Sequence, residues 1–88
     1  MSIAIINLNV VDLTNIVAFF NVELDCGEGM RTTLYGLKLV KSKKNDEYFI
    51  GYPQRKADDD RYFNHYHCSP ALAEAILTKS LEKYHATV

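Results

Sequence analysis

The chain of 88 residues has no tryptophan, only two cysteines and two prolines, and almost no net charge. Cys26 and Cys68 lie far apart and form no CxxC pair, which favours reduced thiols, although one disulfide between them stays open. No stretch approaches the roughly 20 apolar residues of a membrane span. The N-terminus also lacks the basic start of a signal peptide. We therefore expect a cytoplasmic protein without a membrane partner.

Several function classes lack their signatures in this sequence. The chain contains no glycine-rich phosphate loop, no nucleophile elbow and no pattern of paired catalytic carboxylates, so we expect neither an enzyme nor a bound cofactor. Ten cations and eleven anions nearly cancel. Attraction for a polyanion must therefore come from local clusters of cations, not from the whole chain.

The length allows one domain over residues 1–88, because two cores would each be too small to offset chain entropy. Pairing between copies would help so small a domain. Alternating apolar residues predict five strands: IAIINLNVV, IVAFFNVELD, TTLYGLKLV, EYFIGY and RYFNHYH. In the first strand the expected apolar face contains Ala4, Ile6, Leu8 and Val10. Turn formers separate the strands, among them CGEGM and SKKND, so we expect an antiparallel meander.

A helix is predicted after the strands. Ser69 is a suitable N-cap, Pro70 fits the first turn, and apolar residues then recur at spacings of three and four: Leu72, Ile76, Leu77, Leu81 and Tyr84. Strands followed by one covering helix give a two-layer α+β domain. The second strand begins apolar on both faces, at Val17, Phe19 and Phe20, which suggests that another subunit covers its second face.

The cations fall into two clusters, one formed by Lys38, Lys41, Lys43 and Lys44, and one by Arg55, Lys56 and Arg61. A hairpin of the third and fourth strands would place the clusters at opposite ends of the fourth strand, so one contiguous basic patch is not guaranteed. Four tyrosines lie between the cations, which suits single-stranded bases that stack while their phosphates pair: Tyr48, Tyr52, Tyr62 and Tyr66. The alternative interpretation is solubilising lysines in turns and ordinary strand tyrosines.

Metal ligation is a weaker interpretation of two motifs. The consecutive carboxylates Asp58, Asp59 and Asp60 lack the spacing of a calcium loop, and a charged loop tip that keeps phosphate away explains them better. His65 and His67 share a strand face and can chelate zinc, with Cys68 or His85 as further candidates. That set is incomplete, so capping or hydrogen-bonding histidines are favoured.

From about Ile16 to His85 the chain resembles the SpoVG family of small bacterial septation and sporulation regulators. Tyr52, Pro53, Gln54, Arg55 and Lys56 are similar to the end of a family strand and the basic triplet after it. The segment from Asp58 through Tyr62 to His67 is similar to the family's turn and its short strand ending in histidine. The close of the helix matches at positions 76, 77, 84 and 85.

This resemblance implies a homodimer that binds DNA or RNA without chemistry. The expected nucleic-acid contacts are Arg55, Lys56, Lys41, Lys43, Lys44, Arg61 and Tyr52, and the expected dimer contacts are Val17, Phe19 and Phe20. Asn7 and Asn9 stand where the family tends to have arginines, and three aspartates replace its Asp-Gly turn, so attraction for phosphate is weakened. The alternative is a protein-interaction module, an inhibitor or adaptor, that keeps the fold and has lost nucleic-acid binding.

Overall fold

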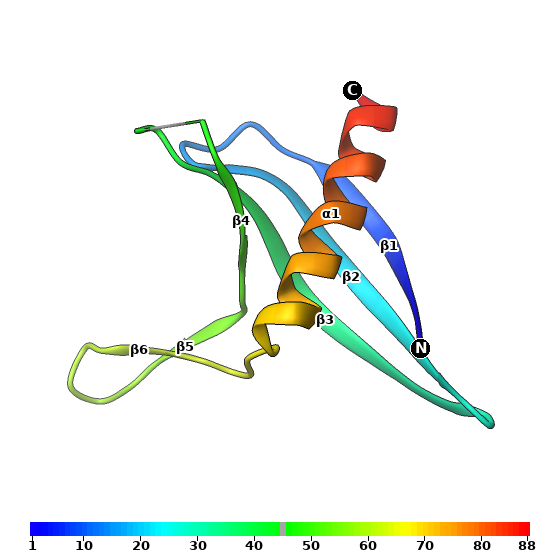
Figure 1. The fold of residues 1–88 in the computed structure, drawn as a ribbon. Coiled ribbons are helices and arrows are strands. Elements are labelled where there is room, and N and C mark those ends of the chain that lie inside the picture. Colours follow the sequence, from blue (N-terminus) through cyan, green and yellow to red (C-terminus); the bar gives the residue numbers. More distant parts are fainter. Residues whose placement is uncertain (45) are drawn as a thin grey trace.

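The computed structural model describes residues 1–44 and 46–88. A four-stranded antiparallel sheet runs in chain order through β1 (Ser2–Val10), β2 (Ile16–Gly27), β3 (Met30–Lys41) and β4 (Tyr48–Gly51) (Figure 1). One helix, α1 (Pro70–Thr87), follows at the C-terminal end. The expected α+β meander with a terminal helix is therefore confirmed. Asn45, part of the predicted turn SKKND, lies outside the described residues.

The predicted fifth strand does not join the meander. The structure instead has two short strands, β5 (Gln54–Lys56) and β6 (Tyr62–Asn64), which pair with each other in a separate sheet. Pro53 lies between β4 and β5 and has no backbone N–H to donate to a ladder, so the sheet ends before it. The expectation of five strands is thus corrected to four strands and a separate hairpin.

The first strand turns a different face to the core from the one expected. Ile5 is buried, with 7% of its surface exposed, whereas Ala4 is exposed. Asn7 adopts a φ of 55°, and the register with β2 shifts between Ile6 and Asn9. This bulge lets Leu8, beyond it, pack against the core as well. The predicted apolar face was wrong because it assumed that side chains alternate without interruption along the whole strand, which the bulge prevents.

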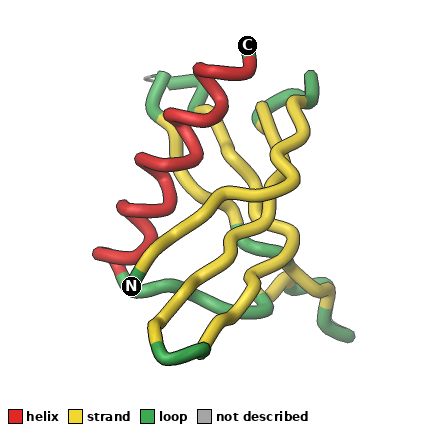
Figure 2. Tube along the Cα trace, turned by 90° about the vertical axis from the view of Figure 1, so that its right-hand side faces the viewer, coloured by secondary structure: helices red, strands yellow, loops and turns green. Residues whose placement is uncertain are grey.

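The core lies between the sheet and α1, which crosses one face of the sheet (Figures 1 and 2). Ser69 caps the helix, since its Oγ accepts a hydrogen bond from the Leu72 N–H at 3.3 Å. From the helix, the apolar side chain of Ile76 is fully buried among apolar strand residues. The complete buried cluster is Ile5, Ala18, Phe20, Val22, Leu24, Leu37, Leu39 and Ile76.

The three residues predicted for the dimer interface do not share one face. Phe20 is 2% exposed and belongs to the core, so its assignment as an interface residue is corrected. Val17 lies where the register of β2 with β3 shifts, and it packs against the same core. Phe19 lies outside that cluster and is paired with Lys38 on the opposite face of the sheet.

The face of the sheet away from α1 has no cover among the described residues. Cross-strand pairing places five apolar side chains on this open face: Ile6, Ile16, Phe19, Val40 and Phe49. The first four are partly buried by their neighbours, and Phe49, on the edge strand β4, is 50% exposed. An apolar sheet face of this kind usually packs against something else.

Candidate nucleic-acid interface

The β5–β6 hairpin projects from the body of the protein, and we call it the arm (Figure 1). At its base the His65 N–H donates to the Pro53 carbonyl at 2.8 Å, and at its tip the Ala57 N–H donates to the Arg61 carbonyl at 2.7 Å. Asp60 closes the turn with a φ of 65°, a left-handed conformation that aspartate tolerates better than most residues. The backbone thus gives the arm a defined shape from base to tip.

Pairing within the arm sorts its side chains onto two faces. Arg55 lies opposite Phe63, and the guanidinium of Arg61 lies over the Phe63 ring at 5.6 Å, so one face presents an aromatic ring between two cations. The other face carries Lys56 opposite Tyr62. Tyr62 is 63% exposed and Phe63 is 45% exposed. Exposed rings beside cations suit unpaired bases, which stack on the rings while their phosphates meet the cations.

Two of the three cations on the arm are held by its own aspartates. Lys56 Nζ lies 3.0 Å from Asp60 Oδ1, and Arg61 Nε donates to Asp59 Oδ2 at 2.6 Å. Arg55 forms no ion pair with any described residue. Because both pairs are exposed, each contributes roughly 0–1 kcal/mol, so another anion can replace the carboxylate.

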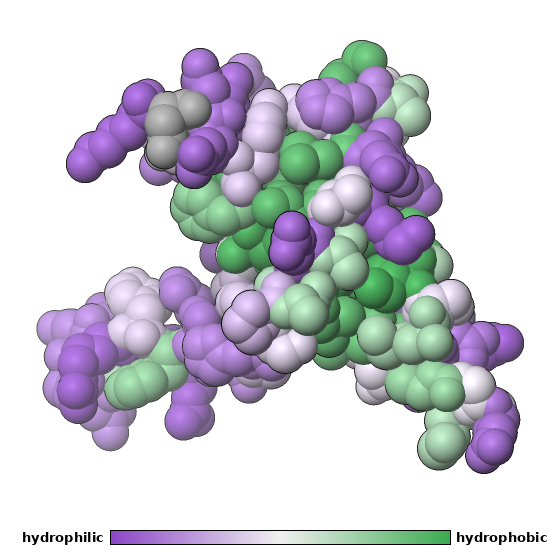
Figure 3. Space-filling model, in the orientation of Figure 1, coloured by the Kyte–Doolittle hydropathy of each residue, from purple (hydrophilic) through white to green (hydrophobic). Residues whose placement is uncertain are grey.

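Three lysines of the second basic cluster lie at the far end of β4 from the arm, at the turn that joins β3 to β4, whereas Lys38 lies opposite Gly51, at the end of β4 next to the arm (Figure 1). Figure 3 shows hydrophilic projections at both places with a hollow between them. The prediction that one contiguous patch is not guaranteed is confirmed for a single subunit. The described residues 41–44 of this segment, which we call the lysine turn, include Lys41, Lys43 and Lys44.

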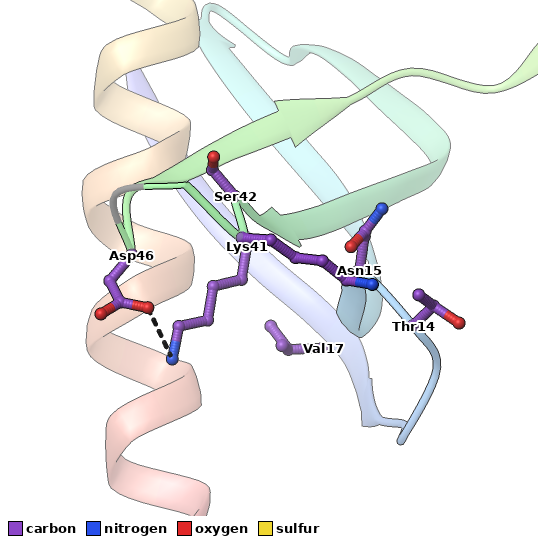
Figure 4. A pocket seen from close by; sticks show the side chains of 7 residues that line it. Thr14, Asn15, Val17, Lys41, Ser42 and Asp46 are labelled. Atoms are coloured by element: carbon purple, nitrogen blue, oxygen red, sulfur yellow. Dashed lines mark ion pairs between the residues drawn. The ribbon is translucent and has the colours of Figure 1, made fainter.

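The three lysines of the lysine turn are not equivalent. Lys41 points towards Asp46, with 3.8 Å between Nζ and Oδ1, and its ammonium lies 5.8 Å from the centre of the Tyr48 ring (Figure 4). Lys43 and Lys44 are exposed. Two hollows adjoin the turn: one of about 290 Å³ includes Asp46 and Val17 in its lining, and one of about 280 Å³ includes Val40 and Phe49.

Tyr52, predicted to contact nucleic acid, is partly buried at the base of the arm. Its ring packs against Tyr66 at 5.7 Å and 75°, and its hydroxyl accepts a hydrogen bond from the Cys68 N–H at 3.3 Å. The Tyr66 hydroxyl donates to the Tyr35 carbonyl at 2.9 Å. Burial raises the pKa of Tyr66 to about 12 and also raises the pKa of Tyr52. This cluster ties the arm to the sheet and to the start of α1.

Phe49 and Phe63 offer exposed aromatic surface that the sequence analysis did not assign to the site. Each lies on a short strand beside the tyrosines that were considered, Phe49 after Tyr48 and Phe63 after Tyr62. The alternation of side chains along each strand could have identified both residues, because neighbouring residues in a strand point to opposite faces. With Tyr48 packed against Tyr84 of the helix, Phe49 must face away from it.

Two of the histidine rings pack against tyrosines. The ring of His67 lies against Tyr52, and that of His85 lies against Tyr48 and Tyr84. Among residues 1–44 and 46–88, no three His, Cys, Asp or Glu side chains gather in a way that could hold a metal ion. Both cysteines are free.

Comparisons of the chain with protein-family models, with curated proteins and with solved structures gave no match. The one described helix is too short or too polar to cross a membrane.

Proposed function

We propose that this protein is a small, non-catalytic regulator that binds single-stranded DNA or RNA as a homodimer. One observation carries the proposal: a projecting hairpin presents Phe63 between Arg55 and Arg61, with Tyr62 and Lys56 on its other face. Cations that track the phosphates, and rings on which bases stack, are the two components of sequence-tolerant single-strand binding. The same segment is similar in sequence to the basic triplet of the SpoVG family, which also favours nucleic-acid binding.

The apolar surface on the open face of the sheet supports a homodimer. Ile6, Ile16 and Phe19, on β1 and β2, form an apolar surface there, and a second copy would bury this half of the open face while the edge strand β4 stays free. In such a dimer each arm brings its own cations, so the number of phosphate contacts doubles without any change in the monomer. Phe19→Lys should yield a monomer in sedimentation velocity, whereas Met30→Lys, on the exposed β2–β3 turn, should leave the mass unchanged.

The binding test compares matched pairs of charge deletions. Fluorescence anisotropy with labelled oligonucleotides should show strong loss of binding for Arg55→Ala plus Lys56→Ala. The control, Arg31→Ala plus Lys79→Ala, removes the same charge from the β2–β3 hairpin and the helix and should bind as wild type. With about three phosphate contacts per subunit, log affinity for a single strand should fall against log salt with a slope of about −4 per dimer. A flat salt response, or equal losses in both double variants, would contradict the proposal.

The second candidate function is a protein-interaction module, and the ion pairs on the arm favour it. Three cations and three aspartates leave residues 54–64 with no net charge, and two of the cations already have carboxylate partners. Such an arm would suit a protein surface of mixed charge. Absence of any oligonucleotide binding at low salt, in a protein that remains folded and dimeric, would select this function.

A further inference from the structure

We infer that Phe49 and the lysines around it form a nucleotide subsite, separate from the arm, that holds one unpaired base of the bound single strand. The inference rests on the proposed nucleic-acid function and names a second place where the strand is held. The subsite lies on the open face of the sheet, at the end of β4 that lies away from the arm.

The aromatic part of the subsite is the ring of Phe49. The side chains of β4 alternate between the two faces of the sheet. Tyr48 and Ile50 pack towards the core, while Phe49 points to the open face, where it is 50% exposed. It lies opposite Val40 on β3, so the hollow beside the ring has an apolar wall. A large exposed ring on a rigid strand is a suitable platform for stacking, worth roughly 1–3 kcal/mol per base.

Gly51 lets the side chains of β3 pack closely beside Phe49. It occupies the next position of β4 on the same face, and a Cβ built there would lie 3.2 Å from Val40 Cγ2 and 3.4 Å from Lys38 Cβ. The side chains of Val40 and Lys38 therefore take up the space over the Gly51 backbone. This packing holds the stem of Lys38 next to the ring of Phe49, and its ammonium can reach a phosphate there.

The charge of the subsite selects an anion. Among the described residues, the hollow of about 280 Å³ at Phe49 has three lysines in its lining and no carboxylate; of these, Lys41 is paired with Asp46 outside this lining. The lining is Asn15, Val40, Lys41, Ser42, Lys43, Lys44 and Phe49. The adjoining hollow on the helix side contains Asp46 and is the poorer anion site. Lys43 and Lys44 on one side of the ring and Lys38 on the other can hold the phosphates that flank one stacked base. An aromatic floor between cations fits a nucleotide better than an apolar peptide.

The subsite also explains how one subunit can use two separate basic clusters. A nucleic-acid strand with one base stacked on Phe49 reaches the arm if it continues along β4. The lysine turn and the arm would then contact successive parts of the same nucleic-acid strand. Base-paired DNA cannot stack a base on Phe49 without unpairing. We therefore expect single strands to bind more tightly than duplexes of the same length.

The test uses the full chain and a labelled oligothymidylate of 12 nucleotides. Phe49→Leu, which keeps an apolar residue but loses the ring, should weaken binding about 5- to 100-fold, as expected for loss of one stacked base. Phe49→Tyr should restore affinity to within about twofold. Lys43→Gln plus Lys44→Gln should lower the affinity and reduce the magnitude of the salt slope by about 1.4 per subunit.

Each contrary result has a distinct meaning. If Phe49→Leu binds as wild type while Arg55→Ala plus Lys56→Ala does not bind, the subsite is overturned and the proposed function stands. If wild type binds no oligonucleotide, the proposed function fails, and the subsite fails with it. If Phe49→Leu loses binding together with a drop in mass by sedimentation velocity, Phe49 is a subunit contact and the inference is overturned.

Discussion

Lys56 and Asp60 form an ion pair across the turn of the arm, with 3.0 Å between Nζ and Oδ1. The pair joins residues four apart in the chain, and the left-handed conformation of Asp60 forms part of the turn that brings them together. An aspartate carboxylate therefore occupies the place at which Lys56 would meet a phosphate. Binding of nucleic acid on this face of the arm requires the carboxylate to be displaced.

Asp60→Asn should strengthen oligonucleotide binding by about two- to fivefold, since it releases Lys56 from an exposed pair worth at most about 1 kcal/mol. Asparagine also tolerates the left-handed conformation, so the turn should persist. Asp58→Asn is the matched control, because it removes the same charge from an aspartate that forms no ion pair with any described residue. Equal gains in anisotropy titrations of the two variants would show that only net charge matters.

Lys83→Met should promote association into larger species. Lys83 Nζ donates to the Ile5 carbonyl at 2.8 Å and so caps the free edge of β1, an edge that would otherwise be open to another strand. Methionine keeps the apolar stem and removes the donor. Sedimentation velocity at rising concentration should show larger species for this variant but not for Lys79→Met, one helical turn earlier. Identical profiles for both variants would contradict a protective role.

Ile76→Ala should lower the free energy of unfolding by about 2–5 kcal/mol, because Ile76 is fully buried between the helix and the sheet. Ser80 is equally buried, and its Oγ donates to the Leu77 carbonyl of the same helix at 2.9 Å. Ser80→Ala should cost about 1 kcal/mol or less, because alanine fits the space and favours the helix. Urea unfolding followed by circular dichroism measures both changes. A cost for Ile76→Ala as small as that for Ser80→Ala would mean that α1 does not pack as described.

The free energy of unfolding should fall as pH rises from about 10 to 12. Burial raises the pKa of Tyr66 to about 12, above its usual value of 10, so the unfolded chain releases this proton at a lower pH than the folded protein does. The stabilisation is therefore complete below pH 10 and is lost as pH rises through the folded pKa. Urea unfolding at pH 8 and pH 11 should show a smaller loss for Tyr66→Phe than for wild type. Tyr62→Phe, which removes an exposed hydroxyl from the arm, should lose as much stability as wild type.

Local sequence patterns predicted most of the secondary structure. Ser69, Pro70 and the apolar spacing after them define the helix, because capping and amphipathic periodicity act over a few neighbouring residues. Gly27 and Gly29 both have positive φ in the turn between β2 and β3, as expected for a tight hairpin. Where a bulge changed the register, as at Asn7, periodicity placed Ile5 on the wrong face.

The candidate site was less predictable than the fold. The sequence identifies the cations of the site, among them Arg55 and Lys56. It does not show which cations are held by aspartates, since that depends on the turn conformation at Asp60. The ring of Tyr52 predicts a contact with nucleic acid, yet that ring packs against Tyr66 and His67, which follow it by more than ten residues. The sequence does not identify Phe49, because its exposure depends on Tyr48 packing against the helix.

The kinds of element, their order and the separation of the cations into two clusters follow from local sequence, because turns, caps and alternation depend on residues close together in the chain. Long-range packing places the last two strands outside the sheet as an arm, turns Phe20 to the core and leaves an apolar face open. These outcomes depend on which distant side chains share a face, and a one-residue bulge or a single proline is enough to change them.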